Sequence, residues 1–407
     1  MPPVPRTRPF LSAVAVLLIV AACSGSGADG DGDDATAPPS TAPPSTAPPE
    51  RFTGSVDDFY RVPDPLPEGV PGQLIRVQDV SSDAGATTVR VMYHSRDAED
   101  ADRAVTGLVT YPTAPAPDGG WPVVAWSHGT TGLGERCAPS RGGLPGPAFG
   151  VEGVVAATDY VGLGPVGEVH PYLSKASEGN AAIDSVRAAR NLADAHAGER
   201  WLSVGHSQGG HAALAAAELS AGYAPELDLL GTVGLAPGSE VDKVYGGIDP
   251  IVTRVLGAMM LYGAEGEHPD FDASDYAGPE LAAVADVVRS ECLDVIVGAV
   301  AGLPADTFYR QDPLTTEPAR SLLLANEVGT VRVDAPLLVV SGTLDDRVVI
   351  DRVRSLYGRL CELGQVTELV VVDGAGHGDI VPRTMPQVEE WLAARLEGAP
   401  PTDSCSA

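Results

Sequence analysis

Hydrophobic positions divide the chain into two kinds of pattern. Apolar and polar residues alternate over 73–80, 87–94 and 104–111, which predicts antiparallel strands. Further along, short apolar runs alternate with segments of helical period. The runs predict strands at 121–127, 153–158, 201–205, 229–235, 336–341 and 368–372, and the helical segments fall at 177–197, 208–221, 350–363 and 385–396. This order is typical of an α/β fold with a mostly parallel sheet flanked by helices.

One long stretch interrupts the pattern before the last two strands. Between 239 and 328 the strand signal vanishes, and apolar helical segments occur at 251–262, 280–288 and 292–302. An insertion at this point predicts a helical cap over the carboxyl edge of the sheet. The core then has a first part at 52–238 and a second part at 329–397, followed by a C-terminal tail at 398–407.

The first 22 residues have the features of an export signal. A positive start with Arg6 and Arg8 leads into an apolar run at 10–22, which is short for a bilayer span of roughly 20 residues. The run ends in small residues directly before Cys23. This junction resembles a bacterial lipobox, which implies cleavage before Cys23, lipidation of its thiol and anchoring on the outer face of the cell membrane. The alternative is an ordinary signal with an incidental cysteine.

Residues 23–51 form a predicted tether between that cysteine and the folded part. A Gly/Asp-rich piece leads into repeated Ala-Pro-Pro-Ser-Thr units from Ala37 onward. Such a segment has too few apolar side chains to offset the entropy lost on ordering. Its prolines favour an extended polyproline II conformation, so we expect a semi-rigid spacer.

Charge and cysteine content narrow the possible functions. The 407 residues carry a formal net charge of -29, which disfavours binding to nucleic acid. None of the five cysteines forms a CxxC pair, which weakens the hypotheses of a zinc site and of a dithiol redox site. Apart from Cys23 there are four, and four cysteines allow three disulfide pairings. Export would permit such bonds.

A G-x-S-x-G motif lies between a predicted strand and a predicted helix. Gly205-His-Ser207-Gln-Gly209 follows the run at 201–205 and precedes the helix at 208–221. A serine at such a turn is held in a strained conformation that exposes its hydroxyl above the sheet. The motif occurs by chance in many glycine-rich chains, so the strand–helix context carries the prediction that Ser207 is a nucleophile.

A histidine that could serve this serine as general base must follow it in the chain. In this arrangement the order is serine, carboxylate, histidine. Of the eight histidines, His211, His268 and His377 lie after Ser207. His268 falls inside the predicted cap, and only His377 lies beyond the candidate acid. His377 lies in a glycine-rich loop after the strand at 368–372, so we predict that it is the base.

The acid is expected just after the preceding strand, at 336–341. Two carboxylates follow there, Asp345 and Asp346. We favour Asp345, the third residue after Gly342, with Asp346 as the reserve. The role of Asp345 would be to fix the tautomer of His377 and to stabilise the imidazolium without taking the proton.

Two backbone N–H groups are expected to form an oxyanion hole. One belongs to Gln208, the residue after the nucleophile, and the other to the loop after the strand at 121–127. In that loop Gly129 would let the backbone approach closely, and Thr130 is the expected donor. His128 is predicted to support the loop by hydrogen bonding.

With these residues placed, the chain resembles the secretory lipase family of α/β hydrolases. The segments that match are Ala125-Trp-Ser-His-Gly-Thr-Thr-Gly, Glu135-Arg-Cys-Ala-Pro-Ser, Ala157-Thr-Asp-Tyr-Val-Gly-Leu-Gly, His170-Pro-Tyr-Leu and Gly205-His-Ser-Gln-Gly-Gly, with the loops of Asp345 and His377. The resemblance implies an α/β-hydrolase fold with a helical cap and acyl esters or lipids as substrates. It also implies a Cys137–Cys292 disulfide and, with it, a Cys361–Cys405 disulfide. The lipid anchor and the tether depart from a freely secreted lipase and favour action at the cell envelope.

These expectations combine into a serine ester hydrolase that acts through Ser207, Asp345 and His377 and needs no metal or organic cofactor. Apolar cap residues either line an acyl channel, act as a lid or simply pack the cap; examples are Val252, Leu256, Met259 and Met260. Two alternatives stay open. The same triad could cleave peptides or transfer acyl groups, or the chain could be an inactive hydrolase-fold binding lipoprotein.

Overall fold

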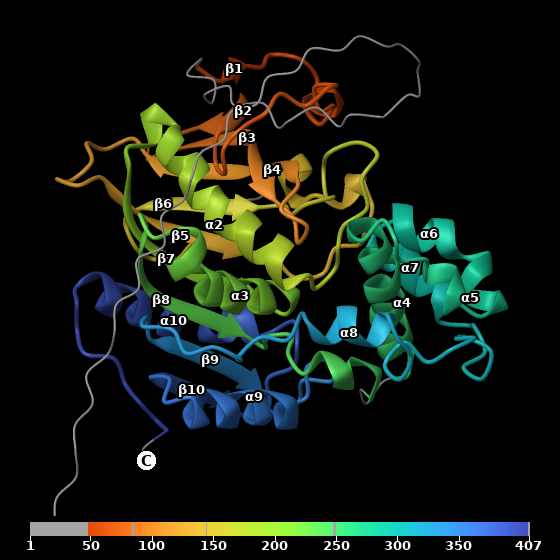
Figure 1. Ribbon diagram of the computed structural model, residues 1–407. Helices are drawn as coiled ribbons and strands as arrows, with labels where there is room; N and C mark the ends of the chain where they lie inside the picture. Colours follow the sequence, from red (N-terminus) through yellow and green to blue (C-terminus); the bar gives the residue numbers. More distant parts are fainter. Residues whose placement is uncertain (1–47, 84, 144, 247–249, 406–407) are drawn as a thin grey trace, which may run out of the picture. The chain divides into compact units, whose positions relative to one another are not determined.

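A computed structural model describes residues 48–405, apart from 84, 144 and 247–249 (Figure 1). The predicted signal at 1–22, Cys23 and most of the tether lie outside the described residues. Among the helices that are described, none combines the length and apolarity that a membrane crossing requires.

A single sheet holds the ten strands of the described chain, in the order β1-β2-β3-β4-β6-β5-β7-β8-β9-β10. Neighbours from β2 to β6 pair antiparallel, and the remaining pairs are parallel, as the two hydrophobic patterns predict. The strands are β1 Glu50–Arg51, β2 Leu74–Ser82, β3 Ala86–Arg96, β4 Asp102–Pro112, β5 Trp121–Ser127, β6 Val154–Thr158, β7 Ala197–His206, β8 Asp228–Leu235, β9 Leu337–Gly342 and β10 Thr367–Val372.

The predicted start of the folded part at residue 52 is slightly late. Glu50 and Arg51 already pair with Arg76 and Val77 of β2 as the short edge strand β1. Arg76 also forms an ion pair with Glu50, at 3.2 Å between Nε and Oε2. A two-residue strand has no alternation to detect, so the sequence pattern gave no sign of it.

Helices cover both faces of this sheet. The helix α2 (Lys175–Asn191) lies beside α3 (Gln208–Tyr223) on one face, and α10 (Ile380–Leu396) packs against β8 on the other (Figure 1). The helix α9 (Ile350–Glu362) packs against β9 and β10. A single turn, α1 (Val56–Phe59), precedes β2.

Two predicted helix boundaries of the core are clearly wrong. The helix predicted at 177–197 ends at Asn191, because Ala197 pairs with Trp121 as the start of β7. Sheet pairing there outweighs the helical propensity of the alanines. The helix predicted at 385–396 begins at Ile380 and contains Pro386 in its interior.

The helix predicted at 280–288 is in fact two short helices, α5 (Pro279–Ala283) and α6 (Ala285–Ser290). Val284, between them, leaves helical geometry with φ −113° and ψ 10°.

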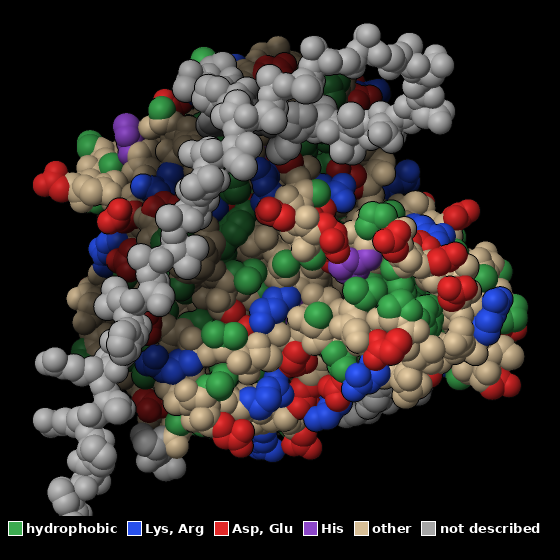
Figure 2. Space-filling model, in the orientation of Figure 1, with side chains coloured by type: hydrophobic (Ala, Val, Ile, Leu, Met, Phe, Trp, Pro, Cys, Tyr) green, Lys and Arg blue, Asp and Glu red, His purple; other side chains and the backbone are tan. Residues whose placement is uncertain are grey.

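The segment between β8 and β9 forms a helical layer with its own core. It holds α5 and α6, and the other helices there are α4 (Pro250–Glu267), α7 (Leu293–Val300) and α8 (Ala319–Leu324). Met259, Leu261 and Phe308 are among its wholly buried side chains. Figure 1 shows α4 to α7 grouped together beside the ends of the strands, and Figure 2 shows hydrophobic side chains gathered on the surface over these helices.

Two disulfides join distant segments, in the pairings that the family resemblance implies. Cys137–Cys292 links the loop after β5 to the start of α7. Cys361–Cys405 links α9 to the C-terminal tail. The tail also binds β10, because the N–H of Ser404 donates to the carbonyl of Thr367 at 3.0 Å.

Removing the first disulfide is expected to destabilise the protein more than removing the second. The sequence separations are 155 and 44 residues, and the longer loop gains more entropy when it is opened. We expect the free energy of unfolding to fall by about 2–5 kcal/mol in Cys137→Ser/Cys292→Ser, about 1 kcal/mol more than in Cys361→Ser/Cys405→Ser. Urea unfolding of both double variants measures this, and a larger loss for the second pair would contradict it.

Candidate active site

Ser207 lies at a tight turn between β7 and α3. Its backbone has φ 59° and ψ −118°, a left-handed region that non-glycine residues rarely occupy. Close contacts around the turn explain the two glycines of the motif. A Cβ at Gly205 would lie 1.9 Å from the carbonyl oxygen of Gly209, and a Cβ at Gly209 would lie 1.9 Å from that of Ser127. The sequence therefore holds the serine in a strained position that any larger residue at these sites would disrupt.

His377 and Asp345 meet this serine from two neighbouring loops at the carboxyl edge of the sheet. The Nε2 atom of His377 lies 2.9 Å from Ser207 Oγ, and its Nδ1 lies 2.8 Å from Asp345 Oδ2. The other carboxylate oxygen of Asp345 accepts the N–H groups of Arg347 and Val348 at 2.9 and 2.8 Å. These contacts fit a histidine that donates from Nδ1 and accepts the serine proton at Nε2.

The two candidate acids differ in their surroundings. Burial favours the protonated form of Asp345, but the hydrogen bond and charge of His377 and two backbone N–H groups outweigh it and lower the pKa of this carboxyl below its ordinary value. The side chain of Asp346 is 67% exposed. His268 is also remote from the serine, since its Nδ1 pairs with Glu99 at 2.7 Å.

A second histidine, His206, supports the loop of His377. Its Nε2 lies 2.9 Å from the backbone carbonyl of His377, and the two rings are 4.8 Å apart. Burial, followed by the charge of His377, lowers the pKa of His206 to about 4, so the ring is neutral near pH 7. Sequence reasoning missed this role. The only available signal was the place of His206 directly before Ser207.

The two residues expected to donate to an oxyanion lie on either side of the serine. Gln208 opens α3 and is almost wholly buried. Thr130 lines the same cavity as Ser207, and its Oγ1 is 2.8 Å from Tyr172 Oη. The expected steric need for Gly129 is weak, because a Cβ there would meet nothing closer than His206 Nδ1 at 3.4 Å.

A cavity of about 630 Å³ opens above Ser207 and His377. Side chains of α4 and α7 form its apolar wall, and its cap residues are Ile251, Val252, Val255, Leu256, Leu293, Val297 and Ala301. Of the four cap residues singled out in the sequence, Val252 and Leu256 line this space, whereas Met259 and Met260 are buried in the core of the cap. The cavity therefore combines the Ser207 hydroxyl with an apolar surface.

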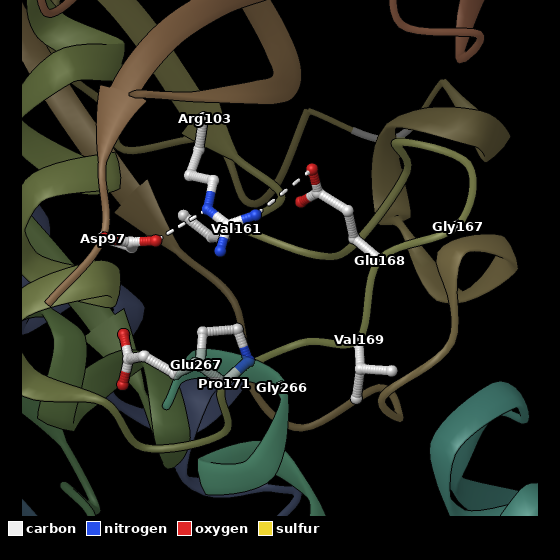
Figure 3. A pocket seen from close by; sticks show the side chains of 9 residues that line it. All are labelled: Asp97, Arg103, Val161, Gly167, Glu168, Val169, Pro171, Gly266 and Glu267. Atoms are coloured by element: carbon white, nitrogen blue, oxygen red, sulfur yellow. Dashed lines mark hydrogen bonds and ion pairs between the residues drawn. The ribbon is translucent and has the colours of Figure 1, made fainter. Parts of the chain in front are cut away.

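A smaller polar cavity of about 220 Å³ lies apart from these residues (Figure 3). Arg103 crosses it, with Nε 2.6 Å from Asp97 Oδ2 and Nη1 3.8 Å from Glu168 Oε1. Glu267, at the end of α4, accepts a hydrogen bond from Ser174 at 2.9 Å and so ties the cap to the start of α2. No three His, Cys, Asp or Glu residues of the described chain are arranged to hold a metal ion.

Comparison with solved structures shows the fold of this chain. The chain aligns with the closed state of Candida antarctica lipase A at a TM-score of 0.71 and 17% identity, over 86% of this chain and 87% of that one. It aligns with the cell wall degrading esterase LipA of Xanthomonas oryzae at a TM-score of 0.67 and 18% identity, over 81% of this chain and all of the other. The chain has the α/β-hydrolase fold, as the sequence predicts.

The family follows from the sequence comparison. The model of the secretory lipase family matches residues 150–404, more than half of the chain, so the protein belongs to that family. It is 24% identical to Lipase 10 of Candida albicans over 56% of this chain, although that match spans only 53% of the relative. It is 22% identical to a probable inactive lipase of Mycobacterium tuberculosis over 86% of this chain and 84% of the relative. The family and the two disulfides indicate a secreted protein.

Proposed function

We propose that the protein is a serine carboxylic ester hydrolase with Ser207 as nucleophile, His377 as general acid and base, and Asp345 as the acid that orients His377. One observation carries the proposal. The Ser207 hydroxyl lies 2.9 Å from an imidazole that is itself bound to a buried carboxylate, and it faces an apolar cavity. These are the parts that activate a hydroxyl for acyl transfer.

In the proposed reaction, Ser207 Oγ attacks the ester carbonyl while His377 Nε2 takes its proton. The resulting imidazolium protonates the alkoxide as the ester bond breaks, so the alcohol leaves and an acyl-serine remains. Water then attacks the acyl group with His377 as base and releases the acid. Asp345 stays ionised throughout, which agrees with its lowered pKa.

The backbone N–H groups of Thr130 and Gln208 are the proposed oxyanion donors. The loop of Thr130 lies against the nucleophile, since a Cβ at Gly129 would be 3.7 Å from Ser207 Cβ. Each donor of this kind typically contributes about 10²–10³-fold to kcat.

The proposed substrates are acyl esters whose apolar chain contacts the cap. Val252, Val255 and Leu256 of α4 face the cavity that holds the serine, and such a wall favours a hydrocarbon chain over a peptide. Relatives named as lipases or an esterase support this class. One relative is named as probably inactive, which keeps an inactive binding protein as the second candidate.

A panel of substrates tests the proposal on the wild-type protein. We expect hydrolysis of p-nitrophenyl esters, compared from acetate to palmitate, to exceed that of peptide anilides. We also expect a fluorophosphonate probe to label the folded chain. A clear preference for anilides would replace the esterase with a peptidase, and no labelling of correctly folded protein would favour the binding protein.

We further propose that the mature protein is a lipoprotein, anchored through Cys23 on the outer face of the cell membrane. The apolar run that ends directly before Cys23, and the Pro-rich tether after it, support this proposal. We expect Cys23→Ser to move the protein out of the membrane fraction, as measured by immunoblotting after fractionation. A Ser24→Ala variant is the matched control and should remain with membranes. Unchanged membrane association of Cys23→Ser would contradict the proposal.

A further inference from the structure

The side chain of Gln208, the residue after the nucleophile, enters a buried polar cluster on the side of α2. Its Nε2 lies 2.7 Å from Glu178 Oε1 and 2.6 Å from His170 Nε2. Its Oε1 has no hydrogen-bond partner among the described residues. The two Nε2–H groups therefore orient this amide by themselves.

Glu178, on α2, is the centre of the cluster. Its Oε1 accepts from Gln208 and from the N–H of Leu173 at 2.8 Å, and its Oε2 lies 3.0 Å from His211 Nδ1. The side chain is wholly buried. Burial disfavours the charged form, but the hydrogen bond and charge of His211 outweigh burial and lower the pKa of Glu178 below its ordinary value.

His211, one turn into α3, faces an acceptor at each ring nitrogen. Besides Glu178 at Nδ1, the carbonyl of Asn326 lies 2.8 Å from Nε2. Both nitrogens must carry a proton to satisfy these partners, so His211 is an imidazolium. Burial opposes this charge, but the hydrogen bond and charge of Glu178 raise the pKa of His211 above its ordinary value.

His170 connects the same amide to the other half of the expected oxyanion hole. Its Nδ1–H donates to the carbonyl of Val161 at 2.8 Å, which leaves Nε2 free to accept from Gln208. The His170 ring stacks on Tyr160 with centroids 5.5 Å apart. Tyr160 donates its hydroxyl proton to the carbonyl of His128 at 2.9 Å, in the loop that continues to Thr130.

We propose that Glu178, His170 and His211 are positioning residues, which hold the side chain of Gln208 and thereby aim its backbone N–H at the oxyanion. This inference rests on the proposed ester hydrolysis. Gln208 is the first residue of α3, so its N–H has no partner within the helix. A pinned side chain limits rotation of the peptide between Ser207 and Gln208, and small errors of alignment reduce the rate strongly.

Three variants separate positioning from simple stabilisation. Gln208→Ala keeps the backbone donor but removes its anchor. Glu178→Leu removes the acceptor, whereas Glu178→Gln keeps every hydrogen bond, because its amide can donate to a neutral His211 and accept from Gln208 and Leu173. The control is Tyr223→Phe, which removes a hydroxyl bonded to Asp184 at 2.8 Å at the far end of α3.

We expect kcat for p-nitrophenyl butyrate to fall about 10–100-fold in Gln208→Ala and in Glu178→Leu, with KM changed by less than about threefold. Glu178→Gln is expected to retain kcat within about threefold, and Tyr223→Phe should match the wild type. Rates are referred to the concentration of active sites titrated with a fluorophosphonate, so loss of folded protein does not count as loss of kcat.

Wild-type kcat in Gln208→Ala would overturn the inference even if Glu178→Leu fails to fold. An equal loss in Tyr223→Phe would also overturn it, because the effect would then be general destabilisation. Proton NMR supplies a reading that does not depend on activity: His211 of the wild type should show two downfield ring N–H signals, and Glu178→Gln should lose one. A wild-type protein that shows both signals but neither hydrolyses esters nor reacts with the probe would refute the proposed function instead.

Discussion

Replacing Ser207 by alanine is expected to lower kcat/KM for p-nitrophenyl butyrate about 10⁶-fold, to the level set by binding and the oxyanion donors alone. The proposed mechanism forms the acyl intermediate on this hydroxyl, which contacts His377 Nε2 at 2.9 Å. Stopped assays at high enzyme concentration, together with fluorophosphonate labelling followed by mass spectrometry, measure the loss. Labelling of the wild type should map to Ser207 and disappear in the variant.

His268→Ala is the control for this variant. It removes another histidine that follows Ser207 in the chain, one whose ring contacts Glu99 at the surface. We expect it to keep wild-type kcat. The backbone of Ser207 accommodates alanine as it does serine, so Ser207→Ala should unfold at the same temperature as the wild type. Substantial ester hydrolysis by folded Ser207→Ala would show that another nucleophile does the chemistry.

The sequence predicted the fold well wherever the hydrophobic pattern repeated over enough residues to be detected. Alternation over 73–80, 87–94 and 104–111 corresponds to β2, β3 and β4, and the later apolar runs correspond to the parallel strands. The errors occur where pairing between distant segments decides the secondary structure. Ala197, for example, lies within the predicted helix but pairs with β5 in the sheet. Local propensity does not contain that information.

The proposed catalytic residues could be predicted from the sequence, but the buried residues of the cluster around Gln208 could not. Chain order and strand ends were enough to select Ser207, Asp345 and His377 as candidates, because parallel strands bring their carboxyl ends to one edge. Glu178 and His211 gave no such signal. A carboxylate within a helix is usually solvated, and only the packing of α2 against α3 buries both side chains completely.

Replacing Asp345 by asparagine is expected to lower kcat about 10⁴-fold with little change in KM. The amide oxygen can still accept the N–H groups of Arg347 and Val348, so the loop keeps its shape. Its NH₂ group, however, would point at Nδ1 of His377. That contact favours the tautomer protonated at Nε2, which cannot accept the proton of Ser207.

The neighbouring aspartate makes the experiment specific. Asp346→Asn removes the same charge one residue later, from a side chain that is 67% exposed and lies 4.0 Å from Arg347. We expect Asp346→Asn to keep kcat within about twofold, because solvent screens the interaction of an exposed carboxylate with the groups around it. Steady-state kinetics of both variants at the same pH measure the difference. A large loss in Asp346→Asn with a mild one in Asp345→Asn would transfer the orienting role to Asp346, whereas comparable small losses would mean that His377 is held without a carboxylate.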